Sequence, residues 1–157
     1  MANLWKNRIT RKTESVRAGI AELEKRINPE DLKAIRTGKL ASPAFTQQAV
    51  SDIMGLTALY FRNAVGLEMP NSDEALFTFV FRYAVCAYAL SLKWVIKGGH
   101  ANAKSDTLRN DYIDMTYAAY ATFFDGLITK DSKLREMYGD SRWILKNVFQ
   151  ISGATRV

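Results

Sequence analysis

The sequence predicts an α/β fold that is predominantly α-helical and carries one short strand. Three observations support this prediction: apolar residues recur at helical spacing along most of the chain, capping residues and glycines punctuate these segments, and one short run is apolar and β-prone. The chain has 157 residues, of which 48% are hydrophobic and 24% charged, a composition typical of a single globular domain, 1–157. The single cysteine, Cys86, excludes an intrachain disulfide framework.

The N-terminal part of the chain predicts three helices. Apolar residues between positions 16 and 27 follow the i, i+4, i+7, i+11 spacing, which predicts an amphipathic helix over 11–26. Asn28 precedes a proline and can cap a short helix over 29–38. Ser42 repeats this start signal, and the apolar stripe after it predicts a third helix over 43–66.

The C-terminal part predicts three more helices and the strand. An almost wholly apolar segment predicts a central helix over 72–96, and a second helix is expected over 105–124. Residues 127–129 are apolar, β-prone and bounded by turn residues, so we expect a buried strand there. A short helix follows over 134–139, and 143–151 fits either a strand or a helix. In the helix over 105–124, four large side chains share one face: Ile113, Tyr117, Tyr120 and Phe124.

The central apolar stretch is long enough to suggest a membrane span. Arg82 and Lys93 interrupt it, however, which favours a buried helix and predicts no membrane partner. The residues before Thr13 contain no apolar run of the kind found in secretory signals. The sequence therefore predicts a cytoplasmic protein.

The formal net charge of +6 is concentrated in a basic helical N-terminal arm, 1–40, with ten Lys or Arg against five Asp or Glu. Such an arm can hold nucleic-acid phosphates. A solvated helix face that aids solubility explains the same charges. The candidate phosphate-binding residues are Lys6, Arg8, Arg11 and Lys12.

Three aspartates form a candidate metal site. Asp111 and Asp114 are three positions apart on one helix, so their Cβ atoms are expected about 5–6 Å apart. The helix from Asp114 to Phe124 advances about 15 Å, and an extended chain to Asp131 returns roughly 16 Å, which would place Asp131 beside Asp114. Converging carboxylates suit a hard cation such as Mg²⁺ or Mn²⁺.

An Asp that opens an apolar helix, followed by the run Leu127-Ile128-Thr129-Lys130-Asp131, resembles the C-terminal portion of PIN-like nucleases. The doubled acid of Asp111 and Asp114 is similar to a subset found in uncharacterised prokaryotic and phage proteins. The resemblance covers about 70–145 and implies a PIN-like α/β fold. It implies metal-binding roles for Asp111 or Asp114 with Asp131, and more weakly for Glu74.

PIN-like domains begin with an apolar strand that ends in an Asp, and residues 1–14 contain no such strand. The resemblance therefore implies a partial fold, either because the chain is a fragment of a longer protein or because the leading half has been lost.

The resemblance implies a metal-dependent ribonuclease that hydrolyses phosphodiester bonds with a water activated by Mg²⁺ or Mn²⁺, so RNA is the expected partner. The alternative is a non-catalytic helical module that binds a protein partner, its own copy or nucleic acid. In that case Asp131 caps the following helix, and Asp111 and Asp114 form surface ion pairs with Arg109 and Lys130. Arg82 is either a buried partner of these acids or a surface side chain.

Overall fold

The computed structural model describes residues 14, 16–37, 42–98 and 103–151. A helical segment over 16–26 comes first, and a π-helical turn, η1, continues one of the later helices. The elements that follow are α2 (Pro29–Arg36), α3 (Pro43–Tyr60), η1 (Phe61–Val65), α4 (Ser72–Ala75), α5 (Phe79–Lys97), α6 (Ser105–Ala121) and α7 (Ser132–Asn147).

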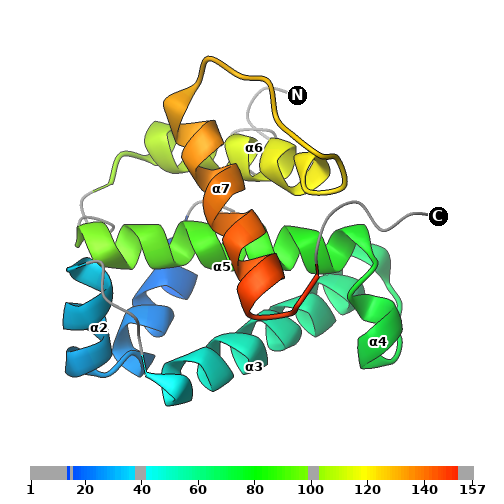
Figure 1. Ribbon diagram of the computed structural model, residues 1–157, viewed down its shortest axis with the longest axis horizontal. Coiled ribbons are helices and arrows are strands. Elements are labelled where there is room, and N and C mark those ends of the chain that lie inside the picture. Colours follow the sequence, from blue (N-terminus) through cyan, green and yellow to red (C-terminus); the bar gives the residue numbers. More distant parts are fainter. Residues whose placement is uncertain (1–13, 15, 38–41, 99–102, 152–157) are drawn as a thin grey trace.

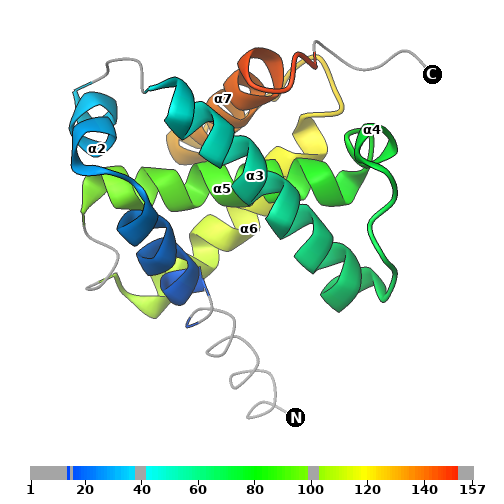
Figure 2. The same ribbon diagram turned by 90° about the horizontal axis from the view of Figure 1, so that it is seen from below.

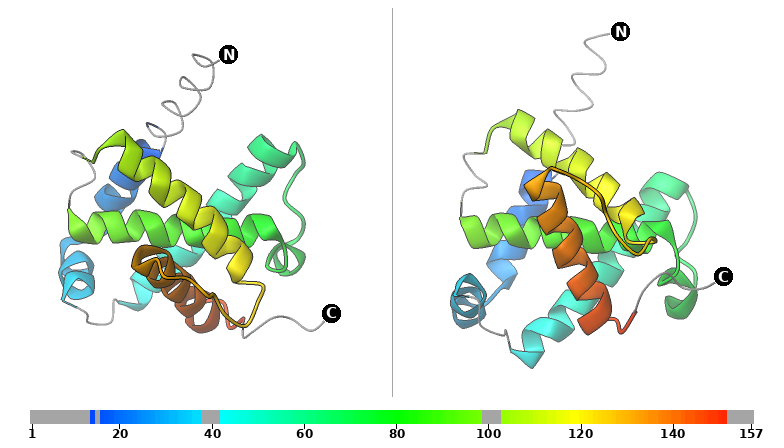
Figure 3. Two further views of the ribbon diagram at one scale, coloured as in Figure 1. Left: turned by 90° about the horizontal axis from the view of Figure 1, so that it is seen from above. Right: turned by 45° about the horizontal axis from the view of Figure 1, so that its top comes forward.

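Helix α5 forms the centre of the fold. Helices α3 and α6 cross it on opposite sides (Figures 1 and 2), and α7 packs against both α5 and α6 (Figure 3). By length and hydropathy alone α5 could cross a membrane, but 56% of its most apolar window is buried inside the protein. That burial is also found in the core helices of soluble proteins.

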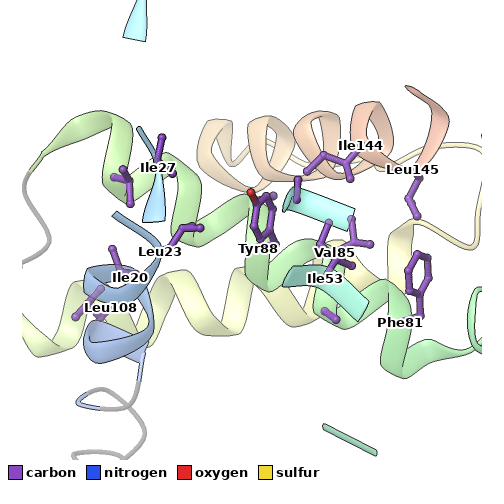
Figure 4. Close-up of a cluster of buried hydrophobic side chains, with 14 residues drawn as sticks. Ile20, Leu23, Ile27, Ile53, Phe81, Val85, Tyr88, Leu108, Ile144 and Leu145 are labelled. Carbon is purple, nitrogen blue, oxygen red and sulfur yellow. The ribbon is translucent and has the colours of Figure 1, made fainter. Parts of the chain in front are cut away.

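Two groups of buried side chains surround α5. The larger joins the segment 16–26, α3, α5 and α7, and Figure 4 shows Tyr88 within it, between Leu23 and Val85. The smaller joins the opposite side of α5 to α6 and α7 and contains Cys86. Burial raises the pKa of the Cys86 thiol to about 12, so the thiol is unreactive at neutral pH.

The helix starts follow from local capping. The side chain of Asn28 accepts the backbone N–H of Asp31 at the start of α2, and Ser42 accepts that of Phe45 at the start of α3. Gly66 ends η1 with a φ of 77°, a conformation that costs glycine little. These elements agree with the predicted helices over 29–38 and 43–66.

The fold class predicted from the sequence is wrong. The described residues are helical or irregular and contain no strand, so the α/β fold with a PIN-like strand is not found in this part of the chain. The predicted strand 127–129 is irregular, and the Ile128 side chain is fully exposed rather than buried. An extended segment needs a paired neighbour to become a strand, and none lies beside it among the described residues.

Two predicted helix boundaries also change. The expected helix over 72–96 is split into α4 and α5, because Thr78 accepts the backbone N–H of Phe81 at 3.2 Å and starts a new helix. The expected short helix over 134–139 continues to Asn147 as α7. The ambiguous segment 143–151 is therefore helical up to that residue.

Candidate functional site

The three predicted aspartates lie close together at the contact between α6 and α7. Asp111 and Asp114 are on α6, and the irregular chain after α6 returns Asp131 to the start of α7. Burial raises the pKa of the Asp114 carboxyl, and the charges of Asp131 and Asp111 raise it further, while Lys133 opposes the shift. The carboxylates therefore interact electrostatically, although a loop rather than a strand brings Asp131 back.

Asp111 is the buried member of the cluster. Its Oδ2 accepts a hydrogen bond from the Trp94 indole N–H at 3.0 Å, and its Oδ1 lies 3.7 Å from the Lys133 ammonium. Both carboxylate oxygens thus have partners from neighbouring helices. This differs from the surface ion pair with Arg109 that the sequence suggested, since Arg109 pairs with Asp106 instead.

Asp131 is the N-cap of α7. Its Oδ1 accepts the backbone N–H groups of Lys133 at 2.8 Å and Leu134 at 3.1 Å. These bonds satisfy two donors that the first turn of a helix otherwise leaves without partners. The capping role suggested by the sequence is therefore present.

The other predicted site residues lie elsewhere. Glu74 is exposed on α4, and no contact within the described ranges joins it to the three aspartates. In the part of the chain that the structure describes, no three His, Cys, Asp or Glu side chains are arranged to hold a metal ion. The proposed phosphate-binding residues of the basic arm, Lys6, Arg8, Arg11 and Lys12, lie outside the described residues.

Arg82 occupies neither position expected for it. It is 2% exposed, so it is not a surface side chain, and its guanidinium lies 5.2 Å from the centre of the Phe123 ring. Burial, together with the charge of Arg142, lowers its pKa. Asp111 and Asp114 are not its partners among the described ion pairs.

The face of α6 that carries Ile113, Tyr117 and Tyr120 points outward, and Phe124 lies in the turn that follows α6. Ile113, Tyr117, Tyr120 and Phe124 are between 46% and 64% exposed, while the opposite face of α6 packs on α5 through the second core cluster. Ile128 in the following loop is also fully exposed. Helix α6 therefore has two apolar faces, and the described chain covers only the one that packs on α5. We call the exposed set of Ile113, Tyr117, Tyr120 and Phe124 the aromatic stripe; it is an uncovered apolar surface.

Sequence reasoning missed a cleft lined by the segment 16–26, α3, α5 and α6. Asp52 lies in it as a buried carboxylate paired with Arg26. A signal was present, since Asp52 falls on the apolar, inward face of α3 beside Ile53, where a charged residue is unusual.

No protein-family model matches this chain, and no curated protein or solved structure is significantly similar to it.

Proposed function

We propose that the protein is a helical interaction module that associates with a second copy of itself through the aromatic stripe of α6. The observation that carries this proposal is the exposure of Ile113, Tyr117 and Tyr120 at helical spacing on α6, together with Phe124 in the turn just after it. Contiguous exposed apolar surface of this kind is typical of interaction sites.

The stripe is suited to pairing with itself. In an antiparallel arrangement of two α6 helices, Tyr117 lies opposite Tyr120 of the second copy, and Ile113 lies toward the turn after α6 that carries Phe124. Every member then meets another member of the stripe, as a two-fold interface requires. No charged residue occurs between Met115 and Phe124, so like charges do not meet within this pairing.

The size of the surface fits a small dimer interface. An aromatic side chain buries on the order of 150–250 Å². Tyr117, Tyr120 and Phe124 are between 56% and 64% exposed, so with Ile113 they offer less than the roughly 800 Å² per partner of a standard interface, as in weak or transient complexes. We expect a reversible dimer rather than an obligate one.

Sedimentation equilibrium over micromolar concentrations tests the proposal. We expect the parent to form a dimer, and the double variant Tyr117→Lys/Phe124→Lys to be a monomer with unchanged helix content, because both side chains are exposed. Trp143→Lys on α7 is the matched control, since Trp143 is 54% exposed outside the stripe. A monomeric parent, or a double variant that dimerises like the parent, would contradict the proposal.

A second candidate function is metal-dependent phosphodiester hydrolysis at Asp111, Asp114 and Asp131, which would require these side chains to move closer together than they lie in the described structure. It is supported by the mutual electrostatic effect of these carboxylates on Asp114. A Mg²⁺ or Mn²⁺ ion there would have to displace Lys133 from Asp111 and would supply orientation of an attacking water. Lys93 and Lys97, which line a small depression with Asp111, are cations that could contact an RNA phosphate.

Calorimetry with Mn²⁺ tests this second function. Asp131→Asn is the informative variant, because Asn caps a helix as well as Asp but is a weaker metal ligand. Saturable Mn²⁺ binding that Asp131→Asn abolishes would support the nuclease function, as would cleavage of a labelled single-stranded RNA. If the parent protein does not bind Mn²⁺, the nuclease function is excluded.

A further inference from the structure

The cleft between the segment 16–26, α3, α5 and α6 has the size of a small-molecule site. Its volume is about 550 Å³, and its walls come from four separate helical segments. Small-molecule pockets of about 300–1,000 Å³ are mostly apolar and contain a few polar groups that orient the ligand. Leu56, Leu90 and Met115 are among the apolar side chains here, and Tyr60 and Tyr112 add aromatic surface.

Two buried polar atoms in the cleft have no hydrogen-bond partner among the described residues. They are Oδ2 of Asp52 and the phenol oxygen of Tyr88, in residues that are 9% and 3% exposed. Oδ1 of Asp52, by contrast, accepts hydrogen bonds from Arg26 and from Gln48 at 2.9 Å. A buried polar group without a hydrogen-bond partner lowers the free energy of unfolding by about 1–3 kcal/mol. Such a group in a folded protein therefore needs an explanation.

Two glycines line the cleft. Gly19 lies in the segment 16–26 and Gly55 in the interior of α3. A Cβ added at either position would meet no heavy atom within 4 Å, so close helix packing does not require glycine there. Glycine inside a helix costs roughly 0.5–1 kcal/mol relative to alanine. Neither close packing nor helix stability therefore explains why glycine occupies these two positions.

We propose that the cleft binds a small, uncharged, amphipathic molecule whose polar end is one group that both donates and accepts hydrogen bonds, a carboxamide or a hydroxyl. Oδ2 of Asp52 and the phenol oxygen of Tyr88 are covered in this structure, so the ligand would first displace the side chains above them. Its donor would then bond to Oδ2 of Asp52, and its acceptor would take the phenol proton of Tyr88. Its apolar body would lie along Leu56, Leu90 and Met115.

The charges at the polar end set this choice of ligand. Arg26 neutralises Asp52 in the ion pair, and Glu22 at the rim is paired with Lys25, so the polar end has no net charge. An anionic group would face the carboxylate of Asp52, and a cationic group would face the guanidinium of Arg26. A neutral group avoids both repulsions and satisfies both orphaned atoms.

The experiment compares three eight-carbon probes by calorimetry: octanamide, octanoate and octylamine. We expect saturable binding of octanamide, and at least tenfold weaker binding of the two charged probes. Tyr88→Phe, which removes one orphaned oxygen and keeps the ring, should weaken octanamide binding about tenfold. Tyr138→Phe, outside the cleft, is the matched control and should bind like the parent.

A second variant keeps the test decisive if Tyr88→Phe is poorly folded. Gly55→Leu places a side chain in the open cleft and should abolish octanamide binding without lowering the melting temperature. Gly139→Leu makes the same change in α7, away from the cleft, and should bind octanamide normally. Equal binding of octanoate and octanamide, undiminished binding by Gly55→Leu, or no binding by the parent would overturn the proposal.

Discussion

Asp52 and Asp111 are both buried carboxylates on helices that pack against α5, yet their surroundings differ. Asp111 has a partner for each oxygen, the Trp94 indole and the Lys133 ammonium. Asp52 has two partners on Oδ1 and none on Oδ2 within the described chain. Asp111 therefore links α6 to α5 and α7 through both of its oxygens. Asp52 leaves one oxygen without a partner in a residue that lines the cleft.

The donors differ as well. Trp94 is a half-buried residue whose indole N–H donates to Asp111. Arg26 and Gln48, the donors to Asp52, belong to exposed residues that can turn to solvent. The same change, from Asp to Ala, should therefore have unequal effects at the two positions.

The largest effect is expected for Asp111→Ala. It leaves the Trp94 N–H without an acceptor and removes a charged hydrogen bond, so we expect a loss of about 2–3 kcal/mol in the free energy of unfolding. Asp52→Ala, the matched change, should cost about 1 kcal/mol or less, since it also removes an orphaned oxygen. Urea unfolding measures both, and a larger loss for Asp52→Ala would reverse the comparison.

Most of the helices could be predicted because their signals are local. The caps at Asn28 and Ser42 and the periodic stripe after Ser42 lie within a few residues of the helices they specify. The strand was wrong because strand formation depends on a partner far along the chain. Thr78 was missed as a cap because apolar residues surround it and the periodicity continues across it.

The candidate sites could be predicted only in part. The return of Asp131 toward Asp114 followed from chain lengths alone, and its capping role followed from its place before Ser132. The pairing of Asp111 with Trp94 depends on how two helices cross, and the pairing of Asp52 with Arg26 joins residues 26 positions apart. Helical periodicity reports which face is apolar, but it cannot tell whether the described chain covers that face.

A second effect, of intermediate size, concerns the cap of α7. Asp131→Ala removes the acceptor for two backbone N–H groups and should cost about 1 kcal/mol in the free energy of unfolding. Asp131→Asn keeps an acceptor and should remain within about 0.5 kcal/mol of the parent. Urea unfolding in the presence of a chelator isolates the capping role from metal binding. If Asp131→Ala and Asp131→Asn lower the free energy of unfolding equally, then the negative charge of Asp131, rather than its capping hydrogen bonds, stabilises α7.

The smallest effect sharpens the comparison within the acidic cluster. The folded-state pKa of Asp114 is raised above its usual value of 3.8, because burial and the charges of Asp131 and Asp111 disfavour its ionised form. Folding therefore favours the protonated form, and the ionised carboxylate destabilises the protein at any pH above the folded pKa. Asp114→Asn should thus raise the free energy of unfolding at pH 7, by about 0.2–0.5 kcal/mol as for like charges one helical turn apart.

The pH dependence tests this sign directly. Below pH 3.8 the carboxyl is protonated in both the folded and unfolded states, so the advantage of Asp114→Asn should disappear there and grow as the pH rises through the folded pKa. Asp125→Asn, an exposed change after the end of α6 that removes the same charge, serves as the control. If Asp114→Asn were less stable than the parent at pH 7, attraction to Lys133 would outweigh the repulsion, and Asp114 would belong with Asp111 as a carboxylate that holds α6 to α7.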